Sequence, residues 1–262
     1  MKHPNPWFSI LLLCGALSAV GLLSGEASAQ LTATANHDRI GIDFFYHGSS
    51  VSVRGSADPG CDLIIKIASP EGEQTLKKKG KVAGLLWMNV GSLHIGEVPK
   101  VYSLHSTREI REIVSREGRE KYVLGYEALE KRADMKPVAD RAEKARWFGE
   151  FVKFQEHSGL YAASVGKILV RNENGKGNYY TLIQWPYQAP PGVYTVTVYA
   201  VKDGKVVQTA ETKVSVEQVG LVKRLADMAK YHGGLYGMLS ILAALGAGFG
   251  VGMVFRKGGG AH

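Results

Sequence analysis

Cysteine is scarce in this sequence, because only Cys14 and Cys61 occur among 262 residues. So few thiols exclude a disulfide-stabilised scaffold, and without a Cys-x-x-Cys pair the common zinc and thiol-redox motifs are excluded too. Cys14 lies in a segment that we expect to be removed, which would leave Cys61 without a partner. Cys61 is therefore predicted to be a small core residue, with a reactive thiol as the alternative.

Recognisable catalytic motifs are missing as well. None of the eight histidines belongs to a His-x-x-x-His or His-Glu-x-x-His pair, and the chain has neither a Gly-x-Ser-x-Gly elbow nor a Gly-x-x-x-x-Gly-Lys phosphate loop. His94 and His105 are read as surface or turn residues, with a meeting across strands as the alternative. We expect no metal, no cofactor and a non-enzymatic role. An enzyme is the alternative, because acid–base catalysis can use carboxylates that are distant in the sequence and meet only in the folded chain.

Charge is not concentrated in any large block, although the formal net charge is +8. Between Ser106 and His157 basic and acidic residues alternate almost one for one. The one dense basic run consists of Lys77, Lys78, Lys79 and Lys81, and it is read as a solvated turn, with a binding patch as the alternative. We therefore expect no nucleic acid partner. The 45% of hydrophobic residues is typical of a folded protein with a real core.

The N-terminus has the order of a secretory signal peptide. A basic Lys2 precedes an apolar run from Trp7 to Leu23, and the small-x-small sequence Ala27-Ser28-Ala29 follows. We expect residues 1–29 to be cleaved off and the rest of the chain to be exported. A lipoprotein signal at Cys14 is the alternative.

No charged residue occurs from Gly233 to Phe255, which is long enough for a transmembrane helix. The basic pair Arg256-Lys257 follows, as expected of a cytoplasmic flank. Together with the signal peptide, this predicts one pass through the cell (inner) membrane, with the N-terminal domain extracytoplasmic or periplasmic and residues 256–262 as a cytoplasmic tail. A sorting tail that is processed is an alternative.

Four glycines of this segment form two overlapping small-xxx-small pairs: Gly246, Gly248, Gly250 and Gly252. Such pairs let two helix backbones approach closely, so these residues are candidates for packing against a partner helix or in a homodimer. The alternative is that glycine is simply tolerated in membrane helices.

The exported part is predicted to be mainly β with a helical insertion, an immunoglobulin-like β-sandwich type, plus the one C-terminal transmembrane helix. Its expected parts are a first β-rich region (30–105), a helical insertion (106–160), a second β-rich region (161–219), a juxtamembrane segment (220–232) and the transmembrane helix (233–255).

Finer patterns predict individual elements of this domain. The alternation from Ile40 to Val53 around a turn at residues 46–49 predicts a hairpin. Ser106 and Glu109 have the spacing of a capping box, which predicts a helix start. Further helices are expected from about Arg119 to Ala133 and from Pro137 to Ser158, and hairpin turns at Asn174-Gly175 and Asp203-Gly204.

One polar-aromatic segment is the most distinctive part of the exported domain. Its candidates for a docking surface are Trp87, Asn89 and Tyr102. The alternative interpretation makes Trp87 a core residue of the sandwich and Asn89 a turn or ladder residue.

Four stretches in this order resemble a bacterial family of transmembrane proteins labelled Alph_Pro_TM: "GIDFFYHGSSVSVRGSA", "GLLWMNVGSLHIGEVPKVYSLHST", "PPGVYTVTVYAVKDGKVV" and "LYGMLSILAALGAGFGVGMVFRK". The resemblance implies the architecture and the membrane location, and it carries no catalytic residues across. We therefore predict a single-pass, membrane-anchored module that docks on another membrane or envelope protein, such as a transporter. An envelope enzyme and a ligand- or cell-wall-binding sandwich are the alternatives.

Overall fold

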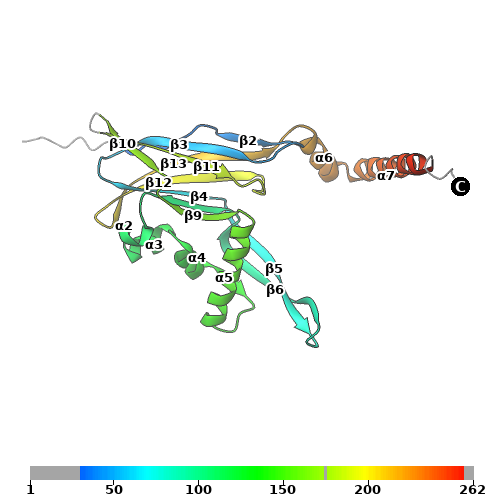
Figure 1. Ribbon diagram of the computed structural model, residues 1–262, viewed down its shortest axis with the longest axis horizontal. Coiled ribbons are helices and arrows are strands. Elements are labelled where there is room, and N and C mark those ends of the chain that lie inside the picture. The colour runs from blue at the N-terminus through cyan, green and yellow to red at the C-terminus, as the bar shows by residue number, and fades with distance from the viewer. Residues whose placement is uncertain (1–29, 174–175, 257–262) are drawn as a thin grey trace, which may run out of the picture.

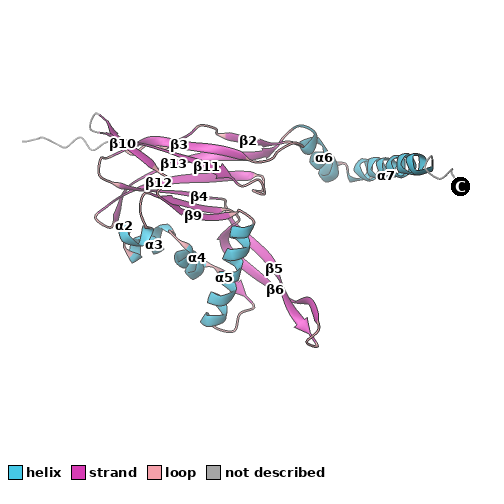
Figure 2. Cartoon of the chain, viewed as in Figure 1, coloured by secondary structure: helices cyan, strands magenta, loops and turns pink. Residues whose placement is uncertain are grey.

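The computed structural model describes residues 30–173 and 176–256. The predicted signal peptide with Cys14, the Asn174-Gly175 turn and residues 257–262 of the predicted tail lie outside the described residues. Strands predominate, several helices lie between two groups of strands, and one long apolar helix ends the described chain (Figure 2). The prediction of a mainly β chain with inserted helices and one C-terminal apolar helix is confirmed, while the immunoglobulin-like detail stays a prediction.

Two sheets form a sandwich. The four-stranded sheet has the order β1-β3-β11-β10 and contains β1 (Thr34–Ala35), β3 (Ser49–Ala57), β11 (Lys176–Trp185) and β10 (Leu169–Glu173). The six-stranded sheet has the order β2-β13-β12-β4-β7-β9 and contains β2 (Arg39–Ile42), β13 (Lys205–Gln218), β12 (Gly192–Lys202), β4 (Asp62–Ala68), β7 (Tyr102–Ser106) and β9 (Tyr161–Val165).

The centre of the six-stranded sheet is buried on both faces, which explains the nearly continuous apolar sequence of β4. Ile65 and Ile67 point into the core between the two sheets, where Trp185 and Tyr194 also pack edge to face at 5.0 Å between ring centroids. Ile64, between them in sequence, points the other way into a second core. Successive strand residues point to opposite faces, so a strand covered on both sides needs no polar positions.

Helices cover the second face of the six-stranded sheet (Figure 1). They are α2 (Ile110–Ile113), α3 (Arg116–Tyr122), α4 (Tyr126–Arg132) and α5 (Arg141–His157). Phe151 of α5 is fully buried in the second core, together with Tyr161 of β9, and their ring centroids are 5.5 Å apart. The helical segment between β7 and β9 is therefore packed on the sandwich rather than separate from it.

Several predicted helix boundaries are wrong. Ser106 does not cap a helix because it is the last residue of β7, and Ser115 instead caps α3 by accepting a hydrogen bond from the Gly118 amide at 3.2 Å. The single helix expected up to Ala133 is split into α3 and α4, because Val123 (φ 50°) and Gly125 (φ 107°) between them are not helical. The last helix begins at Arg141 after the Asp140 cap, rather than at Pro137.

The hairpin predicted from Ile40 to Val53 is also wrong. Its first half becomes β2, which pairs in parallel with β13, and its second half becomes β3, which pairs with β1 and β11 in the other sheet. Both strands alternate, but alternation does not say which sheet a strand joins. The Asp203-Gly204 hairpin between β12 and β13 is confirmed. Cys61 is half-buried against the sandwich core, and burial raises the pKa of its thiol.

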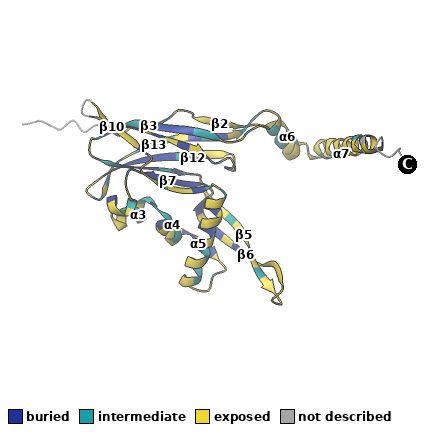
Figure 3. Cartoon of the chain, in the orientation of Figure 1, coloured by how far each residue is buried: buried dark blue, intermediate teal, exposed yellow. Residues whose placement is uncertain are grey.

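A third sheet extends from the sandwich. Its strands are β5 (Glu71–Val82), β6 (Leu86–Pro99) and β8 (Asp134–Lys136), and β5 and β6 form one long hairpin. The base of the hairpin is buried, whereas the far end is exposed on all sides (Figure 3).

Two helices complete the described chain. The amphipathic α6 (Gly220–Tyr231) leads into α7 (Gly233–Arg256), and both extend away from the sandwich along the long axis of the molecule (Figure 1).

Candidate functional site

Helix α7 is the membrane-spanning element. Its stretch Gly233–Met253 is long and apolar enough to cross a membrane, and none of it is buried by the rest of the chain. At about 1.5 Å per residue, it matches a hydrocarbon core of about 30 Å. Tyr231 and Tyr236 lie at its sandwich end, where membrane helices favour aromatic residues.

The four candidate glycines of α7 have open space around them in the described chain. A Cβ placed on Gly246, Gly248, Gly250 or Gly252 would meet no atom within 4 Å. At 3.6 residues per turn, Gly246 and Gly248 lie about 200° apart around the helix axis, whereas glycines four apart share a side. The two pairs therefore line two nearly opposite sides of α7.

Trp87 and Asn89 lie at the exposed end of the β5–β6 hairpin. We call residues 81–91 the hairpin tip, because every residue in this range is exposed. Trp87 is 68% exposed, so the alternative that placed it in the sandwich core is wrong. The tip also exposes other large apolar side chains: Val82, Leu85, Leu86, Met88 and Val90.

Tyr102 does not belong to this surface, because it is only 1% exposed and lies in β7 rather than in the hairpin. Its hydroxyl donates to the Val123 carbonyl at 2.7 Å and accepts from the Gly125 amide at 3.0 Å. Burial raises the pKa of Tyr102 far above its ordinary value. The predicted docking role of Tyr102 is contradicted by this burial; the residue fastens the α3–α4 turn to the sheet.

Lys66 of β4 supports the same turn from the next strand. Its Nζ donates to the Tyr122 carbonyl at 2.7 Å, and burial lowers the pKa of this lysine to about 8. A cation is favourable here because the last carbonyls of α3 carry partial negative charge. The α3–α4 turn is therefore fastened by hydrogen bonds to two neighbouring strands, β7 and β4.

His94 and His105 do not meet. His94 is exposed and contacts Glu73 at 3.1 Å, whereas His105 is 6% exposed and lies between Ser103 (2.9 Å) and Ser164 (2.5 Å). Burial lowers the pKa of His105 to about 4. The prediction of a surface or turn residue is wrong for His105, whose neutral ring satisfies two serine hydroxyls inside the sheet.

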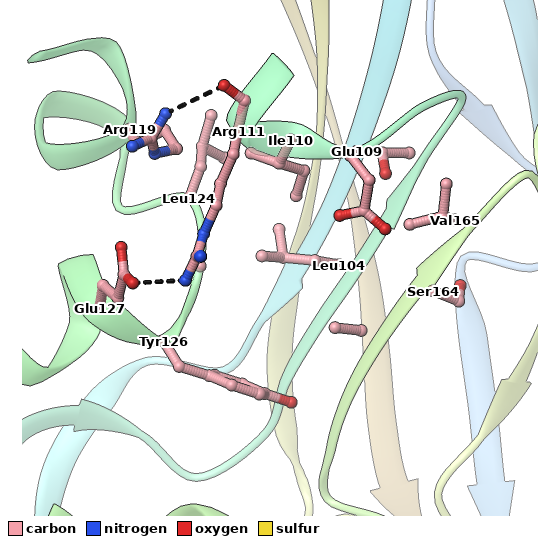
Figure 4. Close-up of a pocket in the computed structure, with 13 residues that line it drawn as sticks. Leu104, Glu109, Ile110, Arg111, Arg119, Leu124, Tyr126, Glu127, Ser164 and Val165 are labelled. Carbon is pink, nitrogen blue, oxygen red and sulfur yellow. Dashed lines mark hydrogen bonds and ion pairs between the residues drawn. The ribbon is translucent and has the colours of Figure 1, made fainter. Parts of the chain in front are cut away.

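An apolar groove lies between the helices and the end of the six-stranded sheet (Figure 4). We call it the β9 groove. Its cavity measures about 230 Å³, and its lining is mostly apolar, with Leu104, Leu124, Tyr126 and Val165 among the contributors. One wall is formed by the ion pair of Arg111 with Glu127, which joins α2 to α4.

Two features of the β9 groove are open to solvent. β9 is the last strand of its sheet, so its outer edge is not paired with another described strand. Glu109 points toward the cavity beside Val165 in Figure 4, and no hydrogen bond or ion pair of its carboxylate occurs within the described chain. The groove thus combines an apolar floor, a strand edge and an uncompensated negative charge.

Sequence reasoning missed this groove for a physical reason. Its residues come from β7, β9 and three short helices, and no local pattern links these segments. β9 lies at the start of the predicted second β-rich region (161–219), but no individual strand was predicted there, and only Tyr161 of its five residues is buried. Within the described residues, no group of three or more His, Cys, Asp or Glu side chains could hold a metal ion.

One comparison with known proteins gives a match. Residues 30–257 match the model of a family described as "Putative transmembrane protein (Alph_Pro_TM)". No curated protein matches the chain significantly.

Proposed function

Because the chain belongs to the Alph_Pro_TM family of transmembrane proteins, we propose that it is a non-enzymatic interaction module for another membrane or envelope protein, with α7 as its single-pass anchor. We further propose that the sandwich is extracytoplasmic, that the membrane is the inner membrane and that the residues after α7 are cytoplasmic. The signal-like N-terminus and the basic residues after α7 support this orientation.

The observation that carries the proposal is the β9 groove. An open strand edge beside an apolar cavity is the arrangement used in strand addition, in which backbone hydrogen bonds give affinity and side-chain pockets give specificity. Val165 is 46% exposed at this edge, so a bound segment would cover apolar surface that water now contacts.

The charge of the groove defines the partner further. The carboxylate of Glu109 has no cationic partner in the described chain, whereas Arg111 is already paired with Glu127. A bound segment that carries a lysine or arginine next to an apolar residue would fill the cavity and pair with Glu109. We therefore propose an extended, apolar and basic segment of the partner as the occupant.

Purification of the tagged full chain from detergent-solubilised membranes tests this function. Ala163 lines the groove and is exposed, so Ala163→Trp fills the cavity from an accessible position. Ala162→Trp is the matched control, because Ala162 is also exposed but faces the opposite side of β9. We expect a stoichiometric membrane or envelope partner with wild type and Ala162→Trp, and its loss with Ala163→Trp. Equal recovery with all three chains would contradict the proposal.

A second contact of the same module is proposed within the membrane. In lipid, helices associate through close packing rather than through the hydrophobic effect, and small residues permit it. The glycines on the two sides of α7 leave room for a helix of the partner or of a second copy.

A further inference from the structure

We propose that the hairpin tip is a second membrane contact, which enters the headgroup region of the bilayer that α7 crosses. The proposal concerns a surface separate from the β9 groove and commits to one occupant, a lipid surface with anionic headgroups. It rests on the two-faced composition of the tip, on its lack of packing and on its position relative to α7.

One face of the hairpin end is apolar. Val82 pairs across the strands with Leu86, and Gly80 pairs with Met88. Val90 lies on this face too, because a Cβ on Gly80 would come within 2.9 Å of the Val90 Cγ2 atom. Leu85, in the turn, is 83% exposed.

The opposite face is basic and aromatic. Lys81 pairs with Trp87, Lys79 pairs with Asn89, and Lys77 pairs with Ser92. The three lysines are therefore spaced two residues apart along one face of β5, whereas Lys78 points to the other face. The lysine run thus lies on strand β5, and its prediction as a solvated turn is wrong.

The apolar face of the hairpin end is continuous with the second core, and it extends past the part of the hairpin that α5 covers. Nearer the sandwich, Leu76 and Leu93 pack with α5. Lys78 marks the limit of this cover, because its Nζ lies 4.6 Å from the centroid of the Trp147 ring of α5. Past this point every residue of the tip is exposed, so its Leu and Met side chains lie in water although their removal from water would be favourable. A contiguous exposed apolar surface of this kind is typical of a site that contacts a membrane or another protein.

The position of the tip favours lipid. Figure 1 shows the hairpin leaving the sandwich obliquely and ending at the same level along the long axis as α6, directly before α7. Since α7 runs along that axis, the membrane surface passes near α6 and the tip together. Tryptophan is enriched at this level of a membrane, and lysines near an anionic surface are attracted to its headgroups.

Quenching by lipids with brominated acyl chains tests the proposal. The purified full chain is placed in vesicles of phosphatidylcholine and phosphatidylglycerol, and tryptophan fluorescence is compared with and without bromine. We expect quenching in wild type and a marked loss of the quenched fraction in Trp87→Phe. The matched control, Asn89→Gln on the same face, should behave as wild type.

Two results would overturn the proposal. Quenching that is absent from wild type, or unchanged in Trp87→Phe, would show that Trp87 does not contact acyl chains. Crosslinking of two Leu85→Cys copies in the same vesicles, at a level that rises with protein density, would show that a second copy covers the tip instead of lipid. Trp87 and Leu85 are both exposed, so neither Trp87→Phe nor Leu85→Cys disturbs the core.

Discussion

Lys81 and Trp87 face each other across the two strands of the hairpin tip, with the Lys81 Nζ 5.5 Å from the centroid of the Trp87 ring. The ammonium group of the lysine and the face of the indole ring attract each other, which keeps the two exposed side chains together. The pair thus presents a positive charge and an aromatic ring at one point, a combination suited to the boundary between headgroups and acyl chains.

The three lysines on one face of β5 predict a dependence on lipid charge. Replacing Lys77, Lys79 and Lys81 together by glutamine should remove the increase in Trp87 quenching that anionic lipid produces, because about 1 kcal/mol per lysine is lost. Lys205→Gln, at the exposed start of β13, is the control. The measurement is quenching as a function of phosphatidylglycerol content, and an unchanged slope in the triple variant would contradict the role of these lysines.

The two glycine pairs of α7 allow a matched test of helix packing. Gly248→Leu with Gly252→Leu fills one side of the helix, and Gly246→Leu with Gly250→Leu fills the other. Both variants stay apolar and should insert, but the assembly seen in blue-native electrophoresis should weaken only for the pair in the interface. Identical assemblies in wild type and both variants would reduce α7 to a tether.

The hydroxyl of Tyr102 should contribute strongly to stability. Tyr102→Phe removes the donor to the Val123 carbonyl and the acceptor of the Gly125 amide, and each buried group left unpaired costs about 1–3 kcal/mol. The free energy of unfolding, measured by urea titration, should fall by about 2 kcal/mol. Tyr180→Phe, at an exposed position, should change it little. Equal effects of the two substitutions would contradict this assignment.

His105 should make the fold sensitive to acid. Its pKa is about 4 in the folded chain and about 6.5 when unfolded, so the unfolded state binds more protons between these values. Stability should be fully present above pH 6.5 and decline as the pH falls toward 4, with a total loss on the order of 3 kcal/mol. Unfolding free energies of wild type and His105→Gln across this range should converge at low pH; parallel curves would exclude His105 as the cause.

The local sequence pattern was sufficient to predict an element where the segments that it contacts in space are also its neighbours in sequence. The alternation around Asp203-Gly204 predicted the β12–β13 hairpin, and the uncharged run predicted α7. It failed where distant segments decide the structure. The alternation around residues 46–49 could not reveal that β2 and β3 join different sheets.

The candidate docking surface could be predicted only in part, because segments distant in sequence decide which of its residues are buried. Trp87 and Asn89 do lie on one exposed hairpin, but Tyr102 is buried because helices fold back over β7. The β9 groove could not be predicted, since it exists only after α2, α4 and β9 have packed together. A tyrosine between strand residues gives no indication of whether a helix will cover it.

The proposed orientation predicts which part of the chain a protease reaches. In spheroplasts, added protease should digest the sandwich, because the proposed orientation takes residues 1–29 as a signal peptide and α7 as a single stop-transfer helix. A tag at the C-terminus should stay protected until the membrane is lysed. Protection of the sandwich in intact spheroplasts would contradict the orientation.

Site-specific photo-crosslinking in living cells tests the proposed interaction most directly. A photoreactive phenylalanine analogue replaces Val165 in the β9 groove or, as the control, the similarly exposed Val170 of β10. The proposed function predicts one crosslinked product from position 165, which mass spectrometry identifies as a membrane or envelope protein, and none from position 170. No product from position 165, or the same product from both positions, would contradict docking at the groove.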